Sequence, residues 1–220
     1  MNKNNTLKSN KELYNKIAKT YQSTWDNDWD DKLEIDKFIE LLKPNNNILD
    51  IGSGTGYITN YLLENKLNPI GIDYSSEMVK IAKEKYPSIN FVNDDITKVI
   101  TSFNKNEIDG IIAFYSLFYT SKKDVKKILK HIAKISKPNA PFLLTIKEGT
   151  GEKFVNEPLL NKEEGKNALF INLYSKKDIT QLLNDNGFII KDFIIKKIND
   201  SNTVTESNTF IITAINNKSY

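Results

Sequence analysis

A glycine-rich turn carries the most specific chemical signature in this sequence. It reads Asn47-Ile-Leu-Asp-Ile-Gly-Ser-Gly-Thr-Gly56, and an amphipathic helical pattern follows it directly. Glycines at positions 52, 54 and 56 allow a sharp turn and let the backbone come close to a ligand. A turn between a strand and a helix also directs N–H groups and the positive end of the helix dipole at that ligand. The motif therefore predicts a ligand-binding loop.

Acidic residues around the turn indicate which ligand it binds. A dinucleotide-binding loop has the spacing G-x-G-x-x-G and receives a pyrophosphate, whereas this turn reads G-x-G-x-G with Asp50 two positions ahead of it. A carboxylate there repels pyrophosphate and suits an ammonium group or hydroxyls. Asp73 ends the next apolar run, where it can accept bonds from both hydroxyls of a ribose. Of the following acidic pair, Asp95 rather than Asp94 is expected to accept a bond from an adenine amino group.

These positions together predict a ligand that joins a nucleoside to an amino acid. Two structural alternatives stay open. The glycine motif could be a plain turn between a strand and a helix, and Asp73 could serve only as the N-cap of the helix that follows it.

Short apolar runs alternate with amphipathic segments, which is typical of an α/β fold with a doubly wound, mostly parallel sheet. The predicted strands are 47–51, 69–73, 89–93, 108–115, 141–146, 188–198 and 209–215, and the predicted helices are 58–64, 76–85, 123–135 and 175–186. The polar link 199–208 contains no helix, so the last two strands are expected to pair antiparallel. The sheet should therefore contain one reversed strand near its C-terminal edge.

Composition limits the classes of protein that fit. The chain of 220 residues suits one domain over 1–220, with a disordered tail over 1–10. No apolar run is long enough to span a membrane and no export signal is visible, so a cytoplasmic location is expected. Cysteine is absent, and the single histidine, His131, lies among lysines, so no metal site is predicted. All 31 basic residues are lysine, which argues against sequence-specific reading of nucleic acid.

Four segments in order, ILDIGSGTG, GIDYSSEMVKIAKEKYP, FVNDDIT and IDGIIAFYSLFY, resemble the class I S-adenosylmethionine-dependent methyltransferases. The resemblance runs from about Tyr14 to the C-terminus. It implies a Rossmann-like, seven-stranded sheet with helices on both faces, N-terminal cap helices over 11–40 and S-adenosyl-L-methionine as cofactor. Ser116-Leu-Phe-Tyr119 and Gly149-Thr-Gly-Glu152 also resemble an uncharacterised bacterial branch, which usually has a histidine where Tyr119 stands.

The resemblance also assigns residues to the parts of the cofactor. Asp50, Gly52, Ser53 and Gly54 would hold the methionine part, and Tyr21 of the cap helix would close over it. Asp73 would bind the ribose, with Tyr74 and Met78 beside the adenosine. Asp95 and the Ile96 backbone would face the adenine, and Ala113 and Phe114 would lie beneath the cofactor.

The expected function is methyl transfer by in-line displacement to a small-molecule acceptor, by a monomer or homodimer that needs neither nucleic acid nor membrane. The segment 148–174 is long and weakly periodic, so it is expected to form a lid over the acceptor. Candidate base or orienting groups are Tyr119, Glu148, Glu152 and Tyr174, and Trp25 and Trp29 are candidates for the acceptor pocket. The alternatives are a methyltransferase acting on RNA or protein, and a protein that binds the cofactor without turnover.

Overall fold

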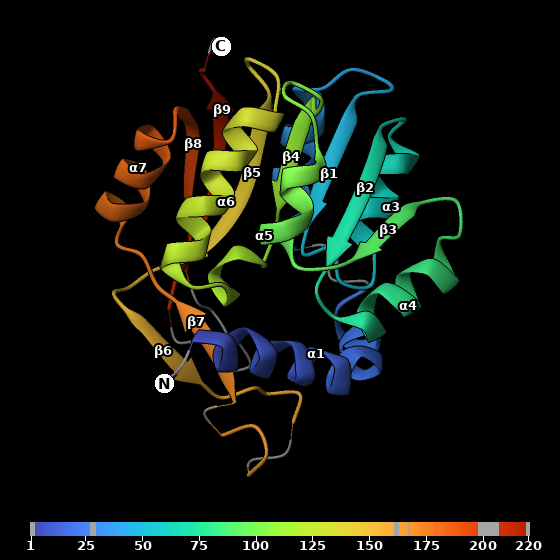
Figure 1. Cartoon of the computed structure of the whole chain (residues 1–220), viewed down its shortest axis with the longest axis vertical. Helices are drawn as coiled ribbons and strands as arrows, with labels where there is room; N and C mark the ends of the chain where they lie inside the picture. Colours follow the sequence, from blue (N-terminus) through green and yellow to red (C-terminus); the bar gives the residue numbers. More distant parts are fainter. Residues whose placement is uncertain (1–2, 27–29, 161–162, 167, 198–206, 219–220) are drawn as a thin grey trace.

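A twisted seven-stranded sheet organises the chain in the computed structural model, which describes residues 3–26, 30–160, 163–166, 168–197 and 207–218 (Figure 1). The strand order is β3 (Asn90–Asn93), β2 (Asn68–Asp73), β1 (Asn47–Ile51), β4 (Gly110–Ala113), β5 (Pro141–Lys147), β9 (Thr209–Asn216) and β8 (Phe188–Lys196). The first five pair in parallel, and β9 runs antiparallel to both β5 and β8. The predicted fold class, with one reversed strand near the C-terminal edge, is confirmed.

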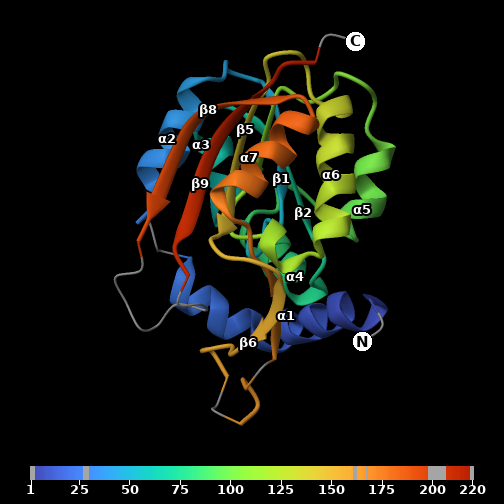
Figure 2. The same cartoon turned by 90° about the vertical axis from the view of Figure 1, so that its left-hand side faces the viewer.

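Helices cover both faces of this sheet, as two perpendicular views show (Figures 1 and 2). One face carries α2 (Lys32–Glu40) and α3 (Tyr57–Glu64), and the other carries α5 (Ile96–Val99), α6 (Lys122–Ile135) and α7 (Lys176–Asp185). The helix α6 buries Val125, Ile128, Leu129 and Ile132 on one stripe, which is why its lysines face outward. A further helix, α4 (Ser76–Lys85), packs beside β3 through Val79 and Ala82.

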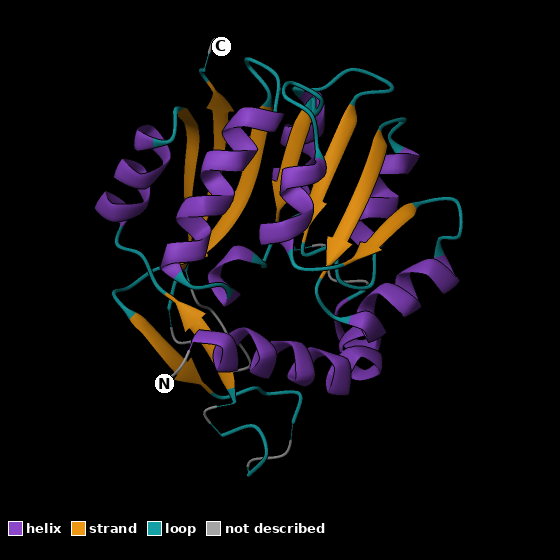
Figure 3. Cartoon of the chain, in the orientation of Figure 1, coloured by secondary structure: helices purple, strands orange, loops and turns teal. Residues whose placement is uncertain are grey.

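A second layer lies along the edge where the parallel strands end (Figure 3). It consists of α1 (Lys3–Trp25) and a hairpin of β6 (Glu152–Val155) and β7 (Leu169–Asn172). The predicted cap helices over 11–40 correspond to α1 and α2, and the hairpin falls in the segment predicted as a lid. The predicted disordered tail over 1–10 differs from the structure. Residues 1–2 of that tail lie outside the described residues, and the chain is helical from Lys3 onward. Within this helix Asn10 is buried, and its side-chain amide bonds the backbone of Phe170.

The strand β4 is shorter than the predicted range 108–115, and the backbone explains the difference. Tyr115 has φ +50, a left-handed conformation that ends the extended chain. At the other end, Ile108 makes only an isolated bridge to Ser136. None of the helices in the described part of the chain is long and apolar enough to cross a membrane.

Gly71 in β2 offers a test of how tightly this strand packs against the Phe91 side chain and the glycine turn. A Cβ there would lie 2.5 Å from the Phe91 ring and 2.9 Å from Ser53 Oγ. We expect Gly71→Ala to lower the free energy of unfolding by about 3 kcal/mol, the upper part of the range for overpacked cores. Urea unfolding measures the change. Gly151→Ala is the control, because it has φ +81 but open space around its Cβ, and it should cost only about 1 kcal/mol. Equal losses in the two variants would contradict the packing argument.

Candidate functional site

The turn between β1 and α3 folds back onto the end of β2. Three of its glycines adopt positive φ, with values of +76 at Gly52, +54 at Gly54 and +84 at Gly56. The N–H groups of Gly52 and Ser53 both donate to the Ile72 carbonyl, at 2.8 and 3.0 Å. Other residues avoid these φ values, so the glycine spacing is what allows the turn to reach its neighbouring strand.

Asp73 is the side chain that fastens this turn. Its Oδ2 accepts the Gly54 N–H at 2.9 Å and its Oδ1 accepts the Ser75 N–H at 2.8 Å. Burial raises the pKa of the Asp73 carboxyl above its usual range, and these N–H donors oppose that rise. The N-cap of α4 is Ser75, which accepts the Met78 N–H at 3.2 Å, so Asp73 does not take that role. Each carboxylate oxygen keeps acceptor capacity for a ligand hydroxyl.

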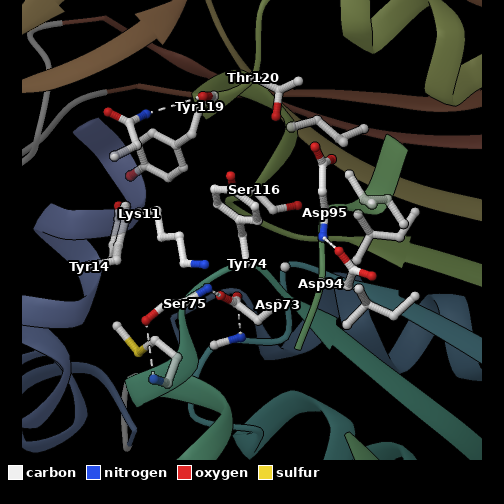
Figure 4. Close-up of a pocket in the computed structure, with 18 of the residues that line it drawn as sticks. Lys11, Tyr14, Asp73, Tyr74, Ser75, Asp94, Asp95, Ser116, Tyr119 and Thr120 are labelled. Carbon is white, nitrogen blue, oxygen red and sulfur yellow. Dashed lines mark hydrogen bonds between the residues drawn. The ribbon is translucent and has the colours of Figure 1, made fainter. Parts of the chain in front are cut away.

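A cleft lies between this turn and α1 and encloses about 950 Å³, part of it open to solvent (Figure 4). Of the residues predicted to bind the cofactor or to catalyse, the following line it: Tyr21, Gly52, Gly54, Asp73, Tyr74, Met78, Asp95, Ile96 and Tyr119. The fold therefore brings together residues from five separate segments of the chain.

Asp95 has a structural partner besides its place in the cleft. Its Oδ1 caps α5 by accepting the Thr97 N–H at 2.9 Å and the Thr97 hydroxyl at 2.8 Å. Asp94 is exposed, yet it also lines the cleft, and its Oδ1 accepts the Asp95 N–H at 2.7 Å. The capping bond fixes the Asp95 carboxylate, and Oδ2 has no bond among those found in the described chain.

Asp50 points away from the cleft. It is buried, and its Oδ2 accepts the Thr59 hydroxyl of α3 at 2.6 Å. Burial raises the pKa of Asp50 to about 7; the Thr59 bond opposes that rise and the charge of Asp73 adds to it. Its neighbour Ile51 lines the cleft instead, as expected when successive strand residues face opposite sides. The structure thus places Asp50 behind the turn, where it contacts α3.

Three more predicted cofactor residues lie outside the lining of the cleft. Ser53 is buried in the turn, and its hydroxyl has no hydrogen-bond partner in the described chain. Ala113 and Phe114 are buried at the end of β4, within the two main core clusters.

The candidate bases of the 148–174 segment also lie away from the cleft. Glu148 Oε2 accepts the Asn208 amide at 2.6 Å, and the exposed Glu152 accepts the Lys122 N–H at the start of α6 at 2.8 Å. The Tyr174 ring faces the Lys122 ammonium, at 4.5 Å. Among the described residues of the cleft, Tyr119 is therefore the one candidate that the fold brings to the site.

One face of α1 closes the cleft. The Tyr21 ring lies 4.0 Å from where a Cβ on Gly54 would be, and the Tyr14 ring meets the Tyr21 and Tyr119 rings edge-on. The Tyr14 and Tyr119 hydroxyls share a hydrogen bond, and burial raises the pKa of Tyr119, so it stays a protonated phenol. Asn10, Lys11 and Tyr14 were not predicted. The spacing of Asn10, Tyr14 and Tyr21 on one helical face is the signal that could have indicated them.

Charge in the cleft is mostly negative. Asp73, Asp94 and Asp95 line it, and the Lys11 ammonium lies 4.7 Å from the centroid of the Tyr74 ring. Trp25 is half-buried and does not line the cleft, and Trp29 lies outside the described residues. Within the described ranges, no cluster of His, Asp or Glu is arranged to hold a metal ion.

Comparisons with known proteins find similarity to methyltransferases. Residues 48–139 match the family model of a methyltransferase domain. A putative methyltransferase, 235L, of Invertebrate iridescent virus 6 is 33% identical over 141 residues, which are 61% of this chain and 49% of that protein. The carboxy-S-adenosyl-L-methionine synthase of Nautilia profundicola is 30% identical over 135 residues, or 59% of this chain and 56% of that protein. The chain thus spans about half the length of these curated relatives.

A similar fold occurs in solved structures. The 1,6-didemethyltoxoflavin-N1-methyltransferase of Burkholderia thailandensis, solved with 1,6-didemethyltoxoflavin and S-adenosylhomocysteine, has a TM-score of 0.75. It is 14% identical, and the match covers 99% of this chain and 92% of that one. A methyltransferase from Methanosarcina mazei has a TM-score of 0.70 at 21% identity, over 80% of this chain and 94% of that one. At these identities the likeness shows the fold.

The buried Asp50 predicts a pH dependence of stability. Because the pKa of Asp50 is raised on folding, the native state holds a proton that the unfolded chain releases, so this residue destabilises the fold as pH rises from about 4 to 7. We expect Asp50→Asn, which keeps an acceptor for Thr59, to gain stability relative to wild type by roughly 3 kcal/mol over that interval. Urea unfolding at pH 4, 5.5 and 7 measures it. A difference between the two proteins that stays constant with pH would contradict the assignment.

The hydrogen bonds of the Asn10 side-chain amide are expected to hold α1 over the cleft. It donates to the Phe170 and Tyr119 carbonyls, at 3.0 and 3.2 Å, and accepts the Phe170 N–H at 3.0 Å. We expect Asn10→Ala to speed amide hydrogen exchange in α1 at least tenfold, because each buried bond contributes about 1 kcal/mol. The exposed Lys19→Ala on the same helix is the control. Unchanged exchange in Asn10→Ala would mean that other contacts hold α1.

Proposed function

We propose that this chain is a class I S-adenosylmethionine-dependent methyltransferase that transfers the methyl group of S-adenosylmethionine to a small-molecule acceptor. The match of residues 48–139 to a methyltransferase domain supports this family. The observation that carries the proposal is the pairing of the glycine turn with Asp73. A carboxylate held by two backbone N–H groups at the mouth of a cleft is suited to accept two vicinal hydroxyls. The acids of the cleft also favour a ligand that carries positive charge.

The residues of the cleft fit the parts of that cofactor. Asp73 would hold the ribose, the Tyr74 ring and Met78 would contact the adenosine, and Asp95 would accept the adenine amino group through its remaining oxygen. The turn around Gly52 and Gly54 would contact the methionine part. Asp50 would act on that part only indirectly, through α3 and the shape of the turn.

The bound cofactor supplies an activated methyl group on sulfur. The work left to this chain is to align an acceptor lone pair with the breaking bond and to exclude water. Tyr14, Tyr21 and Tyr119 form the aromatic wall that would exclude water. Because Tyr119 stays protonated, it would orient the acceptor by donating a hydrogen bond and would not remove a proton from it.

The small acceptor is proposed from two features. The cleft lies under α1, and Asn10 and Asn15 fasten this helix to β7 and to the start of α4. A covered cleft suits a compound that fits inside it better than a polymer that must pass through it. A gel-shift assay with RNA at low salt, run beside a panel of small acceptors, separates these classes. Shifted RNA with no small-molecule turnover would overturn the proposed acceptor class.

The ribose assignment is tested by S-adenosylhomocysteine binding in titration calorimetry. We expect Asp73→Ala to weaken binding about 10- to 100-fold, because a hydrogen bond to a charged group contributes about 1.5–3 kcal/mol. Asp94→Ala is the matched control, since Asp94 lines the same cleft but is exposed, and it should change the affinity less than threefold. NADH should not bind the wild-type protein. The proposed function would be refuted if the wild-type protein did not bind S-adenosylhomocysteine, or if it bound NADH more tightly.

A further inference from the structure

The charged side chains of the cleft gather at one end of it. Asp73 ends β2, and Asp94 and Asp95 follow β3, the strand at the edge of the sheet beside β2. The Lys11 ammonium lies over the ring of Tyr74, the residue directly after Asp73. The charged side chains among the described residues of the cleft therefore lie where the proposed function places the nucleoside.

The other end of the cleft is lined by uncharged side chains. Tyr14 comes from α1, and Tyr119 and Thr120 come from the short segment between β4 and α6. In Figure 4, Tyr14 and Tyr119 lie on the side of the cleft opposite Asp94 and Asp95. A compound bound against these tyrosines meets uncharged side chains.

The glycine turn lies between these two ends. Ser116 packs so closely on Gly52 that a Cβ at Gly52 would collide with its side chain. Ser116 lines the cleft, and Tyr119 follows it three residues later. In the proposed cofactor the sulfur joins the ribose to the methionine chain, which the turn would contact. The uncharged end is thus the side from which an acceptor is expected to reach the methyl group.

Aromatic rings form the wall of this uncharged end. The centroids of the Tyr14 and Tyr119 rings lie 5.4 Å apart, edge to face, and Tyr21 meets Tyr14 in the same way at 6.0 Å. The buried Phe118 ring packs on Tyr119, with centroids 4.3 Å apart. Rings that pack on one another keep their orientation. A flat ring of a ligand gains more from packing against them than an aliphatic group of equal area does.

Most polar atoms at this end already have partners within the protein. The two amide hydrogens of Asn10 bond the Phe170 and Tyr119 carbonyls. The Tyr14 and Tyr119 hydroxyls bond each other, which uses one of their two hydrogens and leaves one for a ligand. Burial raises the pKa of both phenols, and the charge of the buried Glu157 adds to the rise, so an ionised Glu157 would also repel an anionic ligand.

We propose that the acceptor is an uncharged aromatic compound whose ring packs against Tyr14 and Tyr119 and accepts one hydrogen bond from this pair. The inference rests on the proposed function and adds the class of substrate. A carboxylate or an ammonium group would lose its water here without gaining a charged partner, whereas an uncharged ring loses little.

The transfer itself balances without a further reactant. A lone pair on oxygen or nitrogen of the acceptor forms the bond to the methyl carbon, and the electrons of the carbon–sulfur bond return to sulfur. The proton on the nucleophile leaves to water.

The test compares compounds that share a ring and a nucleophile and differ in charge. The uncharged probes are 4-hydroxybenzamide and 4-aminobenzamide. Their counterparts are the corresponding benzoates, which are anionic, and the corresponding benzylamines, which are cationic. Formation of S-adenosylhomocysteine is the readout. We expect at least one amide to be methylated with a kcat/KM at least tenfold above both of its charged counterparts. A charged compound that performs as well as its amide would overturn the proposal.

Binding measurements test the need for an aromatic ring. Each probe is titrated by calorimetry into protein saturated with S-adenosylhomocysteine. We expect 4-hydroxybenzamide to bind at least threefold more tightly than trans-4-hydroxycyclohexanecarboxamide, which lacks the aromatic ring. Equal affinities would contradict the packing role of the tyrosines. The same titrations decide the case in which no probe is methylated. An amide must then bind more tightly than its charged counterparts, and the proposal fails if neither amide binds.

Two variants of Tyr14 separate its ring from its hydroxyl. We expect Tyr14→Leu to raise the KM or Kd for the amide at least tenfold, whereas Tyr14→Phe keeps the ring and should change it less than threefold. S-adenosylhomocysteine should bind both variants as it binds wild type. Tyr86→Leu is the control, at a half-buried tyrosine outside the cleft, and should leave the KM or Kd unchanged.

A Tyr14→Leu variant that binds the amide as wild type does would refute the assignment. If that variant does not fold, Tyr119→Leu and Tyr119→Phe are compared in the same way, with the same expected results. Wild-type protein that fails to bind S-adenosylhomocysteine would refute the proposed function. Wild-type protein that binds it and prefers a charged acceptor would refute only the inferred class of substrate.

Discussion

The hydrogen bond from the Gly54 amide to the Asp73 carboxylate is the interaction on which the site depends. It joins the turn after β1 to the end of β2, beside the two bonds that the turn makes to the Ile72 carbonyl. Since Ser75 bonds the other oxygen, the plane of the carboxylate is fixed before any ligand arrives. Preorganised acceptors of this kind cost little to order on binding. The direction of α3, which begins directly after Gly56, follows from the same turn.

Most of the fold could be predicted because long segments show a clear hydrophobic period. Short elements, which show no such period, could not be predicted. The bounds of β1, α4 and α6 follow from apolar runs and from the 3.6-residue stripe, which depend on burial and extend over many residues. The hairpin strands β6 and β7 have four residues each, too few for a period to stand out. The helical start of α1 was missed for another reason. Its stability depends on contacts with β7, at residues about 160 positions away in the sequence.

Side-chain direction was the harder part of the site to predict. Asp50, Glu148 and Glu152 have the right chemistry, and Asp50 adjoins the cleft residue Ile51 in the sequence. Each carboxylate nevertheless bonds another part of the fold instead of facing the cleft. A strand residue faces one of two sides, and sequence patterns do not say which side holds the ligand when both are apolar. The residues that α1 contributes come from outside the glycine motif altogether. Their common helical face becomes informative only once the helix is known to cross the cleft.

Tyr115 is the point at which two electrostatic environments meet. A left-handed conformation costs a tyrosine about 1 kcal/mol, and here the Thr145 hydroxyl accepts its N–H at 2.5 Å while Asp31 accepts its hydroxyl. The conformation turns the chain so that Ser116 packs against Gly52, while the Tyr115 ring lies toward Lys147. Carboxylates therefore line the cleft on one side of this residue, and Lys147, Lys196 and Asp31 gather on the other. Strain retained at the residue between them is consistent with a functional constraint on this part of the backbone.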